Sequence, residues 1–410
     1  MTTAVDTEAS HTLAADLEAA AQIGAVPGGG ISRFAWTPEL AEVTRRVGRE
    51  LERLGLVVET DTAGNMIARW PAPAGKAVMA ASHLDTVPRG GPLDGVLGVL
   101  GAVEAVRILR REGFEPARPI WIGAFMDEEG GRFGTALFGS RAFCGQDVSA
   151  SLDAQDAAGV SMRDAMAAQG FDAERVHEAA RVDEVGAYVE LHIEQGPVLD
   201  SQGDRLGVVE AICGVLGYRV TVHGEANHAG TTPSGLRRDA LVGASRIVLA
   251  LRERAASRPD LSATVGRIRA LPGATNVIPG RCEFTVDLRA AAAEAFESAR
   301  EWFEEMVATV SAEERLEATV ECDYAVQPTP MAPEVIEAVA AAAVAEGIEP
   351  VRMASGAGHD AMNVGLHAPA GMIFVPSRGG ISHSPEEWTD PADCELGARV
   401  LASTLRQLAS

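Results

Sequence analysis

Four short, near-continuous apolar runs are the feature of this 410-residue sequence that most constrains its fold. They lie at 78–82, 119–126, 187–191 and 371–376. Between them, apolar residues recur at spacings of three and four, as expected for helices. Apolar strands that alternate with amphipathic helices are typical of a mostly parallel sheet with helices on both faces, and we predict this α/β core. Residues 150–185 are predicted to be helical and solvent-facing.

The pattern changes after Cys213. Alternating or extended segments and helical segments then follow in the order strand, helix, strand, strand, helix, strand, at 218–223, 239–254, 262–268, 281–289, 293–310 and 317–322. This β-α-β-β-α-β order is typical of a small α+β domain. We therefore predict one larger domain in two parts, 1–213 and 329–410, interrupted by an inserted domain at 214–328.

Composition narrows the class of protein. Apolar residues make up 47% of the chain and charged residues 23%, which is ordinary for a globular protein. The net charge of −23 argues against a nucleic-acid or anionic-membrane partner, because binding phosphates requires basic patches. No apolar run approaches the length of about 20 residues that spans a bilayer, and no secretory signal is visible near the start. The five cysteines lack C-x-x-C spacing, so we expect reduced thiols and a cytoplasmic location.

Each of the four apolar runs leads to side chains that can bind a metal ion. These are His83 with Asp85, then the acidic triplet 127–129, then His192, and finally His383 beyond a Gly-rich segment. A Gly/Pro-rich turn also delivers Asp94 just before a helix. In open α/β sheets, ligands bind in the crevice beyond the carboxyl ends of the strands. The set therefore predicts a metal site at this edge of the sheet.

Each of these residues taken alone has a simpler interpretation. His192 could be a buried histidine bonded to a backbone carbonyl, and 127–129 could be a solvated acidic helix start. The recurrence at four strand ends favours metal ligation. Imidazole and carboxylate ligands without thiolates suit Zn²⁺ first, with Mn²⁺, Co²⁺ or Ni²⁺ as alternatives.

Eight motifs follow one another from about Gly30 to the C-terminus: S-H-L-D-T-V-P (82–88), L-D-G-V-L-G-V (93–99), D-E-E-G-G-R-F (127–133), G-S-R-A-F (139–143), E-L-H-I-E-Q-G-P (190–197), A-N-H-A-G-T-T-P (226–233), G-A-G-H-D-A (356–361) and G-G-I-S-H-S-P-E-E (379–387). This series resembles the N-carbamoyl-L-amino acid hydrolases, which are grouped with allantoate amidohydrolases and β-ureidopropionases in the dinuclear aminoacylase/carboxypeptidase superfamily. The resemblance covers both predicted domains.

The resemblance implies that the larger domain is the catalytic domain and that it binds two divalent metal ions. Asp94 would bridge ions about 3.5 Å apart. His83 and His192 would complete one metal site, and Glu129 with His383 the other. Related peptidases and aminoacylases tend to carry a carboxylate at the position of His192, so the histidine favours the carbamoylase branch.

The resemblance also implies the catalytic groups. Glu128 would be the general base that takes a proton from the metal-bound water and returns it to the departing nitrogen. Asp85 would orient His83 through its other ring nitrogen. His228 would reach the active site of a partner subunit and polarise the developing oxyanion. The inserted domain at 214–328 would then form a homodimer and close like a lid.

Further residues are implied to contact the substrate. Gln195, Asn276 and His359 match such positions in the family. Arg289 ends an alternating strand on its polar side, where a guanidinium could hold a carboxylate in a bidentate pair. Alternatively, Arg289 forms a salt bridge at the rim and His228 is a turn residue beside Gly230.

The predicted activity is hydrolysis of N-carbamoyl-L-amino acids, small ureido acids, to the amino acid, CO₂ and ammonia. Allantoate is the closest alternative substrate and a β-ureido acid the next. An aminoacylase or dipeptidase is disfavoured by His192, and a catalytically silent metal-binding protein by Glu128. The family usually carries Arg-Phe where this chain has Pro92-Leu93, and Met where it has Ser234, so the substrate preference is predicted to have moved.

Overall fold

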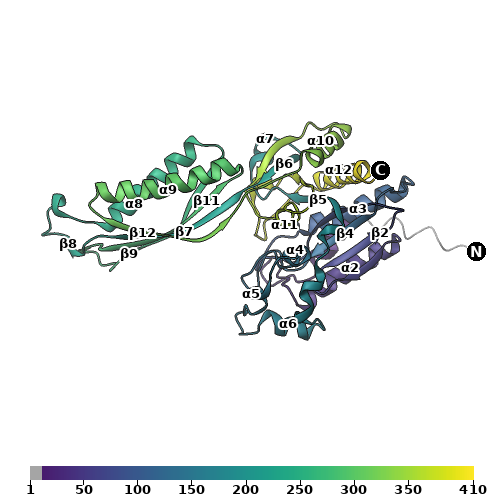
Figure 1. Ribbon diagram of the computed structural model, residues 1–410, viewed down its shortest axis with the longest axis horizontal. Helices are drawn as coiled ribbons and strands as arrows, with labels where there is room; N and C mark the ends of the chain where they lie inside the picture. Colours follow the sequence, from purple (N-terminus) through teal and green to yellow (C-terminus); the bar gives the residue numbers. More distant parts are fainter. Residues whose placement is uncertain (1–11) are drawn as a thin grey trace, which may run out of the picture. The chain divides into compact units, whose positions relative to one another are not determined.

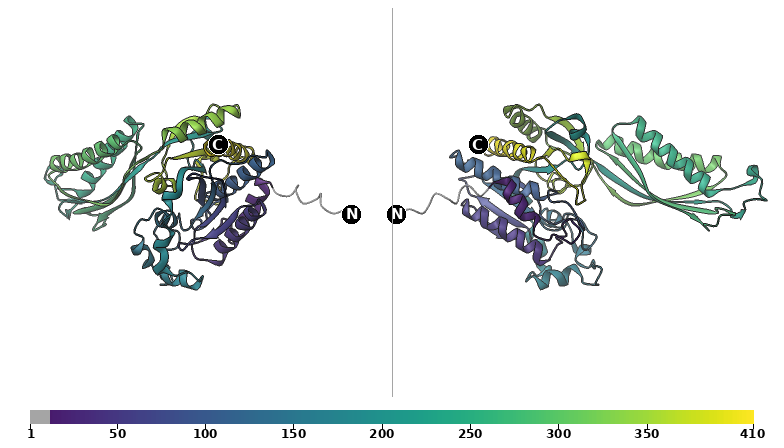
Figure 2. Two further views of the ribbon diagram at one scale, coloured as in Figure 1. Left: turned by 45° about the vertical axis from the view of Figure 1, so that its right-hand side comes forward. Right: turned by 180° about the vertical axis from the view of Figure 1, so that it is seen from behind.

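A computed structural model describes residues 12–410, which form two compact units (Figures 1 and 2). The first unit comprises 12–210, 331–353 and 357–410. The second comprises 211–330 and 354–356, and these residues include the insert predicted at 214–328. Each unit has its own sheet and its own covering helices, so each is described by itself.

The larger sheet has nine strands. Their order is β1 (Val57–Thr60), β2 (Met66–Trp70), β4 (Ile120–Phe125), β3 (Ala77–His83), β5 (Val185–Ile193), β15 (Ala370–Val375), β6 (Gly207–Ile212) and β13 (Thr329–Pro330), with β14 (Val351–Ser355) paired to β6. The four central strands β4, β3, β5 and β15 are parallel, and antiparallel strands flank them. The predicted mostly parallel core is confirmed.

The principal helices of the first unit are α1 (Leu13–Ala21), α2 (Pro38–Arg53), α3 (Val96–Arg111), α10 (Pro333–Ala345) and α12 (Pro391–Ala409), with shorter α4 (Phe138–Phe143), α7 (Val198–Gln202) and α11 (Ala361–Val364). Helix α2 illustrates how the sequence determines where a helix begins and which face it buries. The Thr37 side chain accepts a hydrogen bond from the Leu40 N–H, and Pro38 occupies the first turn. Its buried face includes Leu40, Val43, Val47 and Leu51, as the spacing predicts.

Strand β5 shows that helices cover both faces of this sheet. Its neighbouring residues Glu190 and Leu191 point to opposite faces. On the Leu191 side, a Cβ added at Gly98 of α3 would stand only 2.3 Å from the Leu191 carbonyl oxygen, so glycine lets this helix approach closely. On the other side, Ala361 at the start of α11 donates its backbone N–H to Glu190.

The prediction that 150–185 faces solvent is wrong in part. This segment forms α5 (Ser149–Leu152), α6 (Met162–Ala168) and the 3-10 helices η2 (Ala173–Ala179) and η3 (Val182–Glu184). Met162, Met166 and Val176 are buried in a cluster with Trp36 and Phe138. The partners of these side chains come from distant parts of the chain, so local periodicity did not reveal the burial.

The second unit has a four-stranded antiparallel sheet in the order β12 (Glu317–Val326), β7 (Gly214–His223), β11 (Arg281–Ala290) and β9 (Leu261–Leu271). Helices α8 (Ala240–Ser257) and α9 (Ala293–Glu313) pack against it (Figure 1). Buried Phe284, Val286 and Leu288 alternate with polar residues along β11. The chain order β7, α8, β9, β11, α9, β12 confirms the predicted β-α-β-β-α-β motif.

None of the helices formed by residues 12–410 combines the length and the apolarity that a bilayer span requires. The cytoplasmic location expected from the sequence stays a prediction.

Candidate active site

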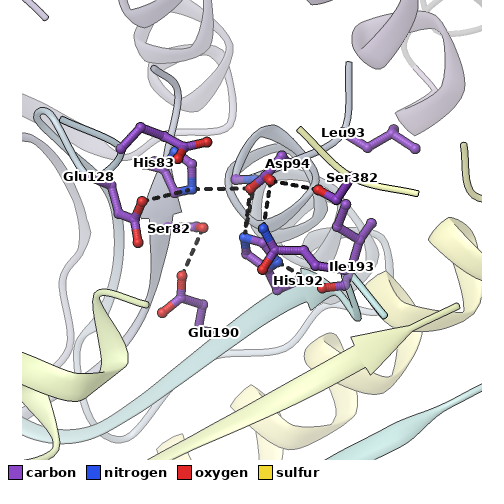
Figure 3. Close-up of polar contacts among 12 residues, drawn as sticks. Ser82, His83, Leu93, Asp94, Glu128, Glu190, His192, Ile193 and Ser382 are labelled. Atoms are coloured by element: carbon purple, nitrogen blue, oxygen red, sulfur yellow. Dashed lines mark hydrogen bonds and ion pairs between the residues drawn. The ribbon is translucent and has the colours of Figure 1, made fainter. Parts of the chain in front are cut away.

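The carboxyl ends of the central strands bring the predicted metal ligands together, and Figure 3 shows three of them, His83, Asp94 and His192. His83 ends β3, and His192 is the penultimate residue of β5. The acidic triplet 127–129 follows β4, and His383 follows the short 3-10 helix η5 (Arg378–Gly380) beyond β15. Asp94 lies in the turn that precedes α3. Parallel strands place their carboxyl ends at one edge, so residues far apart in the chain meet there.

Asp94 lies at the centre of this group. Its Oδ1 atom is 3.2 Å from His192 Nε2 and 3.6 Å from His83 Nε2. Its Oδ2 atom is 3.3 Å from His383 Nε2. The two oxygens of one buried carboxylate therefore face two different sets of histidine nitrogens, which is the arrangement expected of a bridging ligand.

Two candidate metal-binding groups share Asp94. One is His83, Asp94 and His192; the other is Asp94, Glu129 and His383, and in each group the ligand atoms lie within 4.8 Å of one another. Glu129 Oε2 is 3.5 Å from His383 Nε2. The buried Oε1 atom of Glu129 has no hydrogen-bond partner among residues 12–410, which fits a carboxylate built to bind a cation. The donors are nitrogen and oxygen atoms only, so the residues fit two divalent metal ions.

Glu128 and Asp85 border the first of these groups. Glu128 Oε2 lies 3.8 Å from His83 Nε2. The Asp85 carboxylate accepts hydrogen bonds from the backbone N–H groups of Glu128 (3.2 Å) and Glu129 (3.1 Å). His83 Nδ1 lies 3.2 Å from the backbone carbonyl oxygen of Asp85 and 3.6 Å from its carboxylate Oδ1. The Asp85 side chain thus holds the Glu128–Glu129 backbone, in addition to lying beside His83.

Burial and close charges shift the pKa values in the cluster. Burial raises the pKa of Glu128 well above its ordinary value, although nearby His83 opposes the shift. Burial also raises the pKa of Glu129 to about 7. Burial opposes the charged form of Asp94 too, but hydrogen bonds from His192, His383 and His83 outweigh it and hold the Asp94 pKa well below its ordinary value. A buried carboxyl with a raised pKa is suited to exchange protons near neutral pH.

Gln195 and His359 both adjoin the ligand cluster. The Gln195 amide donates from Nε2 to Asp94 Oδ2 at 2.7 Å, and its backbone N–H donates to Ser377 Oγ. His359 is 1% exposed and packs its ring against that of His192, with 4.5 Å between centroids. Burial lowers the pKa of His359 well below its ordinary value, which favours the neutral imidazole. His359 also forms a third group of potential ligands with Glu190 and His192.

His228 and Asn276 belong to the second unit and lie close together there. Strand β8 (Asn227–His228) pairs with β10 (Val277–Ile278), and His228 stands opposite Val277. The Asn276 carbonyl accepts a hydrogen bond from the Ala229 N–H. Both residues are exposed, and His228 Nδ1 accepts a hydrogen bond from the Gly230 N–H.

Arg289 also lies in the second unit. Its Nε and Nη2 donate to the two carboxylate oxygens of Asp287 at 2.8 and 3.0 Å. Its Nη1 donates to the Gly356 carbonyl at 2.6 Å. The bidentate partner of Arg289 in this structure is therefore the carboxylate of Asp287. Residues two apart on a strand lie on the same face, so the sequence spacing is compatible with this pair.

Ser382 and Glu387 also belong to this cluster, and the sequence did not predict a role for either of them. Glu387 is 2% exposed, and its Oε1 atom accepts the backbone N–H groups of Leu93 and Asp94. Ser382 Oγ lies 3.0 Å from Asp94 Oδ2. Their only signal in the sequence is that they belong to the motif at 379–387. Nothing in the local pattern distinguishes buried Glu387 from exposed Glu386.

Three residues depart from the family pattern: Pro92 and Leu93 in the first unit and Ser234 in the second. The Leu93 side chain is directed away from Asp94 (Figure 3). It is buried and, with Pro92, lines an apolar cavity of about 410 Å³ beside helix α1 and Trp388. Ser234 is exposed in the second unit, at the start of η4 (Ser234–Leu236). The Leu93 side chain therefore packs in this cavity rather than at the surface around the Asp94 carboxylate.

Comparison with known proteins agrees with this fold. Residues 79–407 match the model of peptidase family M20/M25/M40. The chain is 39% identical to an N-carbamoyl-L-amino acid amidohydrolase of Geobacillus stearothermophilus, over 95% of this chain and 96% of that one. It is 38% identical to the allantoate amidohydrolase of Bacillus subtilis strain 168, over 96% of each. A solved structure of a hydantoinase/carbamoylase-family amidase from Burkholderia multivorans superposes with a TM-score of 0.89, at 35% identity over 97% of each chain.

The chain therefore belongs to peptidase family M20/M25/M40, a family of hydrolases with the α/β core described above. Within that family it is an amidohydrolase of the group that contains the carbamoylases and the allantoate amidohydrolases. The resemblance inferred from the sequence motifs is confirmed, and so is the prediction of an enzyme.

Proposed function

We propose that this amidohydrolase cleaves the ureido C–N bond of N-carbamoyl-L-amino acids, with release of the amino acid, CO₂ and ammonia. The observation that carries the proposal is the position of Asp94, whose two oxygens face His83 with His192 on one side and His383 on the other. A general-base candidate, Glu128, lies beside the first set. This is the residue set that a two-metal hydrolase needs.

The proposed ligands divide between two divalent metal ions. His83 and His192 would hold one ion, Glu129 and His383 would hold the other, and Asp94 would contribute to both groups of ligands. When bound, such ions make water nucleophilic at neutral pH and polarise a carbonyl oxygen. Zn²⁺ is the first candidate for this donor set, with Mn²⁺, Co²⁺ or Ni²⁺ as alternatives.

In the proposed mechanism Glu128 moves the proton. Its carboxylate takes a proton from the attacking water and later gives it to the departing nitrogen. The raised pKa of this buried carboxyl supports the first transfer, because a carboxylate with a raised pKa is a stronger base. Asp85 supports the geometry of this step, because it fixes the backbone N–H groups of Glu128 and Glu129.

We propose five residues as substrate contacts. His359 and Gln195 lie beside the metal ligands, and His228, Asn276 and Arg289 belong to the second unit. The Arg289 guanidinium has five N–H groups, and three of them, one each on Nε, Nη1 and Nη2, donate hydrogen bonds within the protein. The second N–H group of each Nη atom is left to bind a substrate carboxylate. His228 is proposed to serve the site of a partner subunit, in a homodimer formed through residues 214–328.

A panel of substrates tests the proposal. Purified protein is loaded with Mn²⁺ or Zn²⁺ and given N-carbamoyl-L-amino acids, allantoate or N-carbamoyl-β-alanine, with and without prior chelation, and ammonia release is measured. Chelator-sensitive release from the carbamoyl-L-amino acids is the expected result. Release from allantoate alone would replace the substrate and keep the reaction class, an alternative supported by the 38% identity to an allantoate amidohydrolase. Faster cleavage of N-acetyl amino acids or dipeptides would overturn the ureido assignment.

A further inference from the structure

Glu387 is a buried carboxylate, and one of its oxygens accepts two hydrogen bonds from the turn that carries Asp94. Its Oε1 atom accepts the backbone N–H of Leu93 at 2.9 Å and that of Asp94 at 3.0 Å. Its Oε2 atom accepts the Ser382 hydroxyl at 2.9 Å. Since a buried carboxylate is costly unless it is hydrogen-bonded, three donors on one side chain indicate a built arrangement.

Ser382 extends this arrangement to the Asp94 side chain. Its Oγ atom lies 3.0 Å from Asp94 Oδ2 and 2.9 Å from Glu387 Oε2, so its single hydroxyl hydrogen serves either carboxylate. The backbone of Asp94 and its Oδ2 atom are thus both tied to the segment 382–387. The same segment contains His383, whose Nε2 faces that Oδ2 atom.

Gly91 makes room for Glu387 in this turn. A Cβ added at Gly91 would stand 2.2 Å from Oε1, 2.3 Å from Cδ and 2.4 Å from Cβ of Glu387. These distances are far inside van der Waals contact, and the clash includes the Glu387 Cβ, which cannot rotate away. The glycine therefore matches the position of the Glu387 carboxylate, although the two residues are nearly 300 positions apart in the chain.

We propose that Glu387 is a positioning residue that fixes the Asp94 turn, so that the two Asp94 oxygens point to the two groups of metal ligands. The feature that matters is an acceptor at the position of Oε1 together with a group that bonds Ser382, rather than the negative charge. This inference rests on the proposed metal site, and it adds Glu387 to the residues that support that site.

Two conservative variants separate position from charge. In Glu387→Gln, the amide oxygen accepts both backbone N–H groups and the amide nitrogen donates to Ser382. In Glu387→Asp, the charge is retained but the carboxylate is withdrawn by one methylene. We expect Glu387→Gln to bind Mn²⁺ within about threefold of wild type, and Glu387→Asp to bind it about 10- to 100-fold more weakly, the usual cost of losing a partner of a metal ligand.

The measurement is Mn²⁺ titration of chelator-treated protein by calorimetry, with circular dichroism and thermal unfolding of each metal-free variant to verify folding. Glu386→Gln is the matched control, because Glu386 is the adjacent glutamate and is exposed. Gly91→Ala tests the same contact from the other side and is expected to weaken Mn²⁺ binding as Glu387→Asp does. Equal affinity in wild type and Glu387→Asp, or weaker binding by Glu387→Gln than by Glu387→Asp, would overturn the proposal.

Ammonia release, measured in parallel, distinguishes this inference from the proposed function. A wild-type protein that binds two Mn²⁺ ions but cleaves no ureido substrate defeats the proposed function, and the effect of Glu387→Asp on Mn²⁺ affinity still decides the positioning role. A wild-type protein that turns over, with a Glu387→Asp variant of unchanged Mn²⁺ affinity, defeats the positioning role alone.

Discussion

Asp94 Oδ1 lies 3.2 Å from Nε2 of His192, and both side chains are almost completely buried. The other oxygen of the same carboxylate faces His383, which is half exposed. A single residue thus connects a buried group of ligands to one at the surface of the first unit. The proposed chemistry depends on this connection through Asp94.

Glu128→Gln is expected to bind two metal ions as wild type does and to lose turnover by about 10²- to 10⁴-fold, because the amide cannot take a proton from water. Metal content by elemental analysis and kcat for ammonia release are the measurements. Glu386→Gln serves as the control for a change of charge at an exposed glutamate. Unchanged kcat in Glu128→Gln would remove Glu128 from the mechanism.

His383→Ala is expected to reduce the metal content from two ions to one per chain. His383 faces only the Oδ2 side of Asp94, with Glu129, whereas His83 and His192 face Oδ1. Elemental analysis after dialysis against a limiting concentration of Mn²⁺ measures the stoichiometry. Alanine at His367, a histidine outside all the candidate ligand groups, is the control. Two tightly bound ions in His383→Ala would contradict the division of ligands.

Arg33 is expected to matter for stability. It is 0% exposed and donates to the carbonyls of Leu84, Ala20 and Ile23, which joins the end of helix α1 to the segment that follows His83. Arg33→Met removes these three hydrogen bonds, and among residues 12–410 only the Ala20 carbonyl keeps a backbone donor, the Ile23 N–H, so the free energy of unfolding should fall by about 2–4 kcal/mol. Arg89→Met is the matched control, because exposed Arg89 also donates to two carbonyls. Equal effects in denaturant unfolding would show that burial of Arg33 adds nothing.

Asp61 should make stability depend on pH. Burial raises its pKa to about 6, against hydrogen bonds from Asn65 and Ala63 that favour the charged form. The folded state therefore binds this proton more tightly than the unfolded state, so the stabilising contribution is complete below about pH 4 and is lost as the pH rises through about 6. Across that window, wild type should lose about 2–3 kcal/mol relative to Asp61→Asn, which has no proton to release. Parallel unfolding curves at every pH would contradict the prediction.

Local patterns were sufficient for most of the fold. The spacing of apolar residues in 38–54 predicted α2, and the alternation from Arg281 to Arg289 predicted β11, because periods of 3.6 and 2 follow directly from backbone geometry. Strand order was not readable from these patterns. The antiparallel strands that flank the four parallel ones depend on pairing between segments far apart in the chain.

The candidate site shows the same division. The sequence placed a histidine or a carboxylate at each strand end, and the general rule for open α/β sheets brought these ends to one edge. It did not reveal that the Asp85 carboxylate bonds the Glu128 and Glu129 N–H groups, or that the Gln195 amide bonds Asp94. The directions of these side chains follow from backbone turns, including the left-handed residues Asp127 and Gln195, that no local pattern specified.

The sequence by itself determined which residue types could bind metal, the class of fold and the resemblance to an amidohydrolase family, because periodicity and motifs are properties of neighbouring residues. Only the tertiary structure decided which groups meet. Glu386 and Glu387 are adjacent and identical in type, yet one is exposed and the other is 2% exposed with three hydrogen-bond donors. The difference arises because the fold places the turn that contains Gly91, Leu93 and Asp94 against Glu387. The free-energy cost of burying a carboxylate is offset only where several hydrogen-bond donors surround it.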